Sequence, residues 1–201
     1  MNLSSNQTYE RELLNNVEAA GTALEYSEFA SCEFRCCKFS EIIFNSCTFR
    51  ECHFVDCSLE MMRVDKSVFK QTRFTNSKML GINWTMASWG KREIAQLIKT
   101  INFQGCVLNY SVFMGLNLNG IHFRECTMHE VDFSEALLRK ADFSGSDLQR
   151  AIFRNTDMRE ADFRKARNYS ISSQTNTISQ AKFNLPEAMN LLYAMDIQLN
   201  E

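Results

Sequence analysis

The sequence predicts an all-β solenoid, a chain that bends every five residues and stacks its coils like neighbouring strands. Three observations predict it. Large apolar residues recur every five positions, small residues stand two positions before each of them, and residues of matched size recur every twenty positions. The period is clearest in ADFSGSDLQRAIFRNTDMREADF, residues 141–163, where the large residues are Phe143, Leu148, Phe153, Met158 and Phe163.

A period of five excludes a helix or a plain strand as the repeating unit. Five helical steps of about 100° leave a drift of about 140°, and a strand repeats every second residue. A right-angle bend after each pentad instead gives a four-walled coil of twenty residues. The large residue, called position i, and the small residue at i−2 then point inward. The coils stack at about 4.7–4.9 Å, and their backbone groups pair with those of the next coil.

This geometry requires residues twenty positions apart to lie over one another. Outward residues pair in the same way, because Glu130 and Arg150, and Lys140 and Glu160, carry opposite charges on adjacent coils. The predicted aromatic columns are Phe29, Phe49, Phe69 and Trp89; Phe34, Phe54 and Phe74; Phe113, Phe133 and Phe153; and Phe103, Phe123, Phe143, Phe163 and Phe183.

This repeat of a small residue, a polar residue, Phe or Leu, and two polar residues resembles the pentapeptide-repeat family over residues 22–183. The resemblance implies a right-handed quadrilateral β-helix. The stretch MLGINWTMASW (79–89), the broken frame after it and the segment NLPEAMNLLYAMDIQL resemble the albicidin-immunity and Qnr-type members of the family. This narrower resemblance implies a non-enzymatic homodimer, joined through the C-terminus, that binds DNA gyrase and protects it from a poison of the albicidin or quinolone kind.

The frame breaks between Trp89 and Phe103, which are fourteen positions apart instead of fifteen. We therefore expect an N-terminal cap (1–21), a first β-helical part (22–89), a frame-breaking bulge or short helix (90–102), a second β-helical part (103–183), and a C-terminal cap and dimerisation segment (184–201). Within the break, Ile94, Leu97, Ile98 and Ile101 form one apolar stripe. The break either packs this stripe on the coil or contacts a partner, with Lys91, Arg92 and Lys99 as the candidate partner-binding residues.

The C-terminal segment has the spacing of an amphipathic helix. Asn184 and Pro186 are typical of a helix start. A solenoid end must be covered, so capping is the minimum role of this segment. The candidate dimerisation residues are Leu185, Ala188, Leu191, Leu192, Met195 and Leu199.

The cysteines predict packing rather than chemistry. Seven of the eight occupy the small inward position i−2, and only Cys36 is expected to face outward. A ladder of stacked thiols offers pairs, whereas zinc needs four converging ligands. The three histidines, His53, His122 and His129, fall at outward positions without a recognisable nucleophile partner. We expect no catalytic residues, no metal and no cofactor.

The charge of the chain limits the kind of partner that we expect. The formal net charge is −2, so direct nucleic-acid binding is not expected, and mimicry of DNA by charge alone is weakly supported. Residues 1–60 nevertheless carry ten acids against four bases.

No signal peptide or membrane span is visible, so we expect a cytoplasmic protein. Two alternatives remain open: a generic interaction scaffold with another partner, and a metal-binding or redox protein that uses the thiols.

Overall fold

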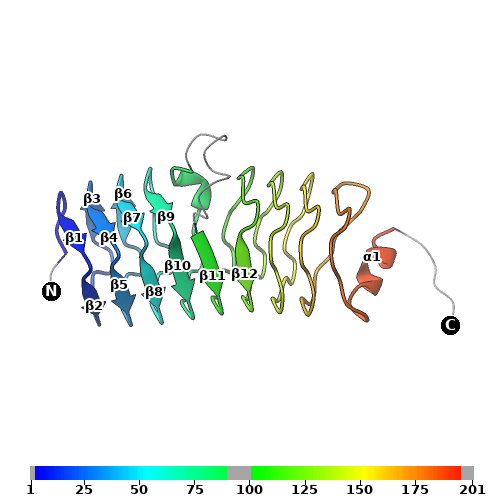
Figure 1. Cartoon of the computed structure of the whole chain (residues 1–201), viewed down its shortest axis with the longest axis horizontal. Coiled ribbons are helices and arrows are strands. Elements are labelled where there is room, and N and C mark those ends of the chain that lie inside the picture. The colour runs from blue at the N-terminus through cyan, green and yellow to red at the C-terminus, as the bar shows by residue number, and fades with distance from the viewer. Residues whose placement is uncertain (1–2, 90–100, 196–201) are drawn as a thin grey trace.

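The computed structural model describes residues 3–89 and 101–195, and these form a β-solenoid with an α-helix at its C-terminal end (Figure 1). Three parallel sheets run along the rod, in the orders β1-β4-β7-β9, β2-β5-β8-β10-β11-β12 and β3-β6. The strands are β1 (Thr8–Glu10), β2 (Leu13–Asn15), β3 (Ala23–Glu25), β4 (Glu28–Ala30), β5 (Glu33–Arg35), β6 (Ile43–Asn45), β7 (Thr48–Arg50), β8 (His53–Val55), β9 (Val68–Lys70), β10 (Thr72–Thr75), β11 (Ile101–Gln104) and β12 (His122–Arg124). A 3-10 helix, η1, spans Trp84–Met86, and α1 spans Met189–Tyr193.

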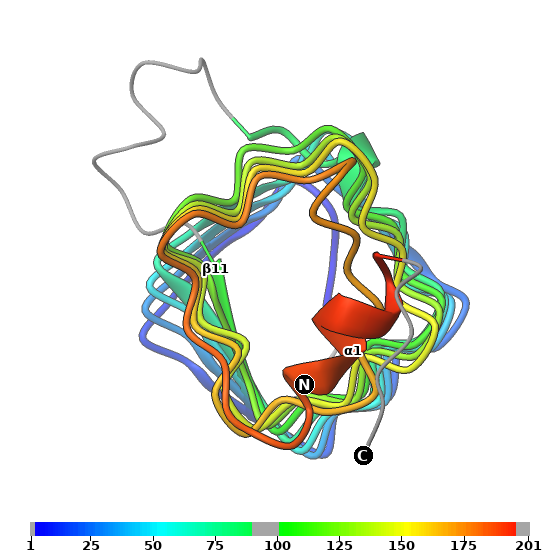
Figure 2. The same ribbon diagram turned by 90° about the vertical axis from the view of Figure 1, so that its right-hand side faces the viewer.

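The register confirms the predicted twenty-residue coil. Thr8 pairs with Glu28, and Glu28 pairs with Thr48. Beyond β12 the coils are too strongly turned to count as strands, but single parallel bridges continue the same spacing as far as the bridge from Asp162 to Lys182. Viewed along the rod, the coils superpose as one four-sided outline (Figure 2).

Stacked aromatic rings fill the interior. Along one wall, the centroids of successive rings lie 4.2–5.4 Å apart, with planes within 16° of parallel. Rings of different walls meet edge to face, as Phe133 and Phe143 do at 84°. Apart from Trp89, the predicted columns are confirmed, and the column of this wall runs unbroken through Phe34, Phe54, Phe74, Phe103, Phe123, Phe143, Phe163 and Phe183.

The predicted frame slip has a simple geometric cause. Thr72 of β10 pairs with Ile101 of β11, twenty-nine positions later instead of twenty, so this coil contains nine additional residues. Nine residues are one short of two pentads, which is why the sequence frame slips by one. The second β-helical part, expected from residue 103, already includes Ile101 in β11. Trp89, expected above Phe69, is half-buried, and its indole Nε1 donates to the Trp84 carbonyl at 2.8 Å.

The corners depend on left-handed backbone. Most residues two positions after a large residue have φ between +49° and +72°, as expected for Gly81, Gly105 and Gly145, but most of these corners carry other residues. At most corners the N–H donates to the carbonyl nineteen positions later, as Arg11 does to Ala30 at 2.8 Å, and across the added residues the separation becomes twenty-eight, as from Gly81 to Asn109. This hydrogen bond helps to offset the left-handed conformation, which costs a non-glycine residue about 1–2 kcal/mol.

The two ends differ from the expected caps. Residues expected as an N-terminal cap already form a coil, because Tyr9 stacks on Phe29 at 4.9 Å and Leu14 pairs with Phe34. At the other end α1 has only five residues and begins at Met189, not near Pro186. Asn184 does not cap it. The Asn184 Oδ1 accepts instead from the Lys165 N–H at 3.1 Å, in the coil beneath.

Gly115 provides a test of the corner geometry. It has φ +70°, and an added Cβ would meet no atom within 4 Å, so only the backbone conformation opposes a side chain. We expect Gly115→Ala to lower the free energy of unfolding by about 1 kcal/mol, and Gly115→Asn to lower it less, because Asn tolerates this conformation. Urea unfolding measures both. Equal stability of the Ala variant and the wild type would contradict the assigned corner.

Candidate functional site

Stacked rings and small residues fill the interior of the solenoid along the coils that the structure describes. The seven inward cysteines are buried and free, and Cys36 is exposed, as predicted. The Cys52 thiol donates to the Phe29 carbonyl at 3.3 Å, and burial raises the pKa of Cys52 to about 12. Such thiols act as small apolar groups that satisfy backbone carbonyls.

Metal binding gains no support from residues 3–89 and 101–195. No group of three or more His, Cys, Asp or Glu side chains in these ranges is placed to hold an ion. The histidines lie on the outer surface and are half-buried. The His53 Nε2 lies 2.9 Å from the Thr75 hydroxyl, and the His129 Nε2 lies 3.4 Å from the Asp147 carboxylate. The His53–Thr75 distance would suit a base and a hydroxyl nucleophile, but the pair lies on the outer wall of the rod, whereas a reactive pair needs a pocket for its substrate.

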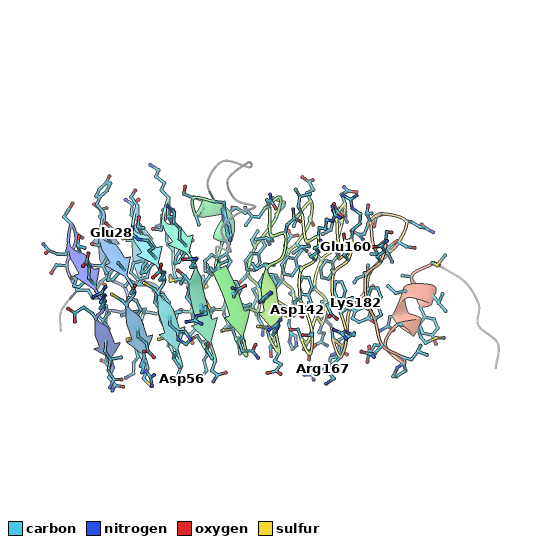
Figure 3. All side chains as sticks on the ribbon, viewed as in Figure 1. Glu28, Asp56, Asp142, Glu160, Arg167 and Lys182 are labelled. Carbon is cyan, nitrogen blue, oxygen red and sulfur yellow. The ribbon has the colours of Figure 1, made fainter. Side chains whose placement is uncertain are left out.

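An open depression of about 540 Å³ lies on the outer surface of the C-terminal coils, where Asp142, Glu160 and Lys182 line it (Figure 3). Its carboxylates are already paired within the solenoid, as Asp142 is with Arg124 and Glu160 with Arg139. Arg164 bonds to Asp162 at 2.6 Å, and this hydrogen bond lowers the pKa of Asp162, so the carboxyl stays ionised at neutral pH. Small-molecule sites are mostly apolar and enclosed. A shallow depression lined mostly by charged side chains does not fit one.

Charge is distributed unevenly along the rod. The N-terminal coils hold the acidic surplus, although Lys38 pairs with Glu18 at 2.5 Å and Arg50 pairs with Glu28. The next coil carries bases on all four walls. We name these bases the basic belt: Arg63, Lys66, Lys70, Arg73 and Lys78.

Beyond the basic belt the signs alternate between coils. The Arg150 guanidinium lies 3.6 Å from Glu130, and the Lys140 ammonium lies 3.5 Å from Glu160, which confirms both predicted pairs. These pairs are exposed, so each stabilises the fold by at most about 1 kcal/mol. Their main consequence is a surface whose charges are fixed in register.

An exposed apolar patch lies beside the basic belt. Its members cover one wall and both corners of that wall in the middle of the rod, and its four large residues are between 49% and 58% exposed. Val112 lies on the wall between them and is half-buried. We name this surface the Met–Tyr patch: Met61, Met86, Tyr110, Val112 and Met114. Sequence analysis missed it because its members belong to different coils, and only the inserted nine residues bring 83 beside 112.

The candidate contact residues predicted from the sequence lie only partly within the described residues. Lys91, Arg92 and Lys99, with Ile94, Leu97 and Ile98, lie outside the described residues, as does Leu199. At the C-terminal end, Leu191 packs against the core, and Ala188 and Leu192 are half-buried. Leu185 and Met195 are exposed, as is Tyr193, which the stripe did not include. Figure 2 shows α1 over part of the open end of the last coil.

No described helix is of a length and hydropathy that would let it span a bilayer. The model of the pentapeptide repeat region matches residues 27–110 and 93–163. The chain belongs to the pentapeptide-repeat family. No curated protein matches this pentapeptide-repeat protein at a significant level.

Solved structures of the same kind are similar along almost the whole chain. Full-length QnrB1, described as a plasmid-mediated fluoroquinolone resistance protein, is 15% identical with a TM-score of 0.46, covering 94% of this chain and 100% of its own. HetL, a pentapeptide-repeat protein involved in heterocyst differentiation regulation in the cyanobacterium Nostoc sp., is 16% identical with a TM-score of 0.45, covering 90% and 86%. At these identities the likeness concerns the fold and not the partner.

Thiol titration tests the assignment of the cysteines. Because seven thiols are buried and Cys36 is exposed, we expect about one fast-reacting thiol in the native protein and all eight after denaturation. Cys36→Ser should abolish the fast reaction and leave the melting temperature unchanged. Two or more fast thiols in the native state would contradict the inward placement.

Proposed function

We propose that this pentapeptide-repeat protein binds DNA gyrase as a homodimer and protects it from a poison of the albicidin or quinolone kind. The observation that carries the proposal is a continuous solenoid with a filled interior, which leaves only the outer surface for function. A surface fixed by backbone pairing on every wall loses little entropy on binding and suits a large protein partner. The stretch MLGINWTMASW, the frame break and the C-terminal segment resemble the gyrase-protecting members of the family and supply the choice of partner.

Protection in this proposal comes from shape and a few contacts rather than from a uniform negative field. Acidic coils, the basic belt and alternating pairs follow one another along the rod, so its surface potential changes sign. A mixed pattern selects a partner with the complementary pattern and disfavours wrong partners. No catalytic step is part of the proposal.

A supercoiling assay with purified gyrase tests this proposal. With albicidin or a fluoroquinolone present, we expect supercoiling to recover as the protein is added, and we expect direct binding to gyrase by surface plasmon resonance. The drug-free reaction is the control, since it separates rescue from inhibition of gyrase by the protein itself. Failure of both rescue and binding at every concentration would reject gyrase as the partner and favour another protein partner.

Dimerisation through the C-terminus has a separate test. Leu185, Tyr193 and Met195 are between 44% and 77% exposed in one chain, and large apolar residues gathered at one end are typical of an interface. We expect the double variant Leu185→Glu with Met195→Glu to sediment as a monomer, because two buried charges would oppose each other across the interface. Leu13→Glu, on β2 at the other end, should leave the dimer intact. An unchanged dimer in the double variant would remove this interface.

A further inference from the structure

The Met–Tyr patch is built around two corners that lack side chains in the neighbouring coil. The Gly81 N–H donates to the Asn109 carbonyl at 2.9 Å, which places Gly81 under Tyr110, and a Cβ on Gly81 would lie 2.5 Å from the Met61 Sδ. The Met61 side chain therefore lies over a glycine and reaches toward Tyr110. A side chain at position 81 would displace Met61 from this arrangement.

The other corner also combines a methionine with a glycine of a neighbouring coil, but here no side chain lies over the glycine. Met86 ends η1, and its carbonyl accepts from the Lys66 N–H at 2.8 Å in the coil below. Gly115 stands at the same corner in the coil above, and nothing lies within 4 Å of where its Cβ would be. Between the corners, Val112 pairs with Asn83, so Met114 lies above Thr85 on the same wall. The result is a ridge that spans one wall and turns both of its edges, apolar in the coil of Tyr110, Val112 and Met114 and interrupted by Asn83 and Thr85 in the coil beneath.

Opposite charges border the ridge along the rod. On the N-terminal side lie Arg63 and Lys66 of the basic belt, with Asp65 paired to Arg63 at 3.1 Å and Glu41 at the corner beneath Met61. On the C-terminal side Asp132 pairs with Val112 through a bridge, and Glu135 follows at the next corner. The negative border disfavours a phosphate backbone or an anionic membrane, since either would place like charges against these carboxylates.

The shape of the ridge decides between the remaining occupants. A second copy of the rod offers flat walls and convex corners, so two rods touch along one wall and cannot cover both corners together. Stable interfaces bury about 800 Å² on each partner. To bury that area here, a partner has to cover the wall and both corners of the patch. Met and Tyr are enriched in the cores of such interfaces, where Met adapts to the partner surface.

We infer that the Met–Tyr patch docks into a concave, largely apolar surface of a different protein, with acidic residues of that protein facing Arg63 and Lys66. Apolar burial supplies the affinity, and the two charged borders set the direction of the rod in the partner. The inference does not require the partner to be gyrase, although gyrase is one candidate.

Site-specific photo-crosslinking tests the docking surface in cells. We would replace Tyr110 with p-benzoylphenylalanine, and Tyr26 as the matched control, because both are tyrosines at left-handed corners with similar exposure, 56% and 63%. We expect a discrete adduct with another protein from position 110 and none from position 26, with the partner identified by mass spectrometry. No adduct at position 110, or an adduct only with a second copy of the chain, would overturn the inference.

Binding of the identified partner, purified, completes the test. Met114→Asp should weaken it by about tenfold or more, and Ile152→Asp, at similar exposure on the same wall, should not change it. Lys66→Glu should weaken binding about threefold to tenfold, and Lys70→Glu, in the same coil on the next wall, should have no effect. Unchanged binding of Met114→Asp would overturn the inference. A partner other than gyrase that needs Met114 and Lys66 would support the inference and reject the proposed function.

Discussion

Pairing of backbone groups between coils is the constraint on which the rest of this structure depends. Each coil receives its hydrogen bonds from residues about twenty positions away, and the corner N–H reaches its acceptor only in a left-handed conformation. Glutamate, lysine and tyrosine adopt that conformation here, for example at Glu130, Lys140 and Tyr110. The conformational penalty at one corner is offset by the pairing of the coils on either side of it, so stability is shared between neighbouring coils.

Periodicity predicted the parts of the molecule that repeat. The wall containing Phe143, the inward thiols and the ion pair of Glu130 with Arg150 follow from the twenty-residue period alone, because each partner has a fixed sequence separation. Features whose partners lack this fixed separation could not be predicted from the sequence. The join from Thr72 to Ile101 depends on nine added residues, and it alone places Val112 beside Asn83. The Met–Tyr patch could therefore not be assembled from spacing.

The C-terminal segment shows a second limit of pattern reasoning. An apolar stripe at helical spacing suggested a longer helix, whereas α1 occupies five residues and Asn184 serves the coil beneath it. Spacing cannot tell whether a helix end is capped by its own side chains or tied to a neighbouring element. Leu191 faces the core and Leu185 faces outward, so the stripe divides between two surfaces.

The nine-residue addition has a consequence for how such a rod can change. Phe103 stacks on Phe74 at 5.4 Å, much as Phe123 stacks on Phe103, so the coils above the addition keep the phase of those below it. The coil underneath, and not the length of chain travelled, sets where each residue stands. Segments can thus be inserted or deleted at such a join while all later side chains stay on their own walls. Inserted segments can therefore vary in sequence and length without a change in the solenoid that carries them.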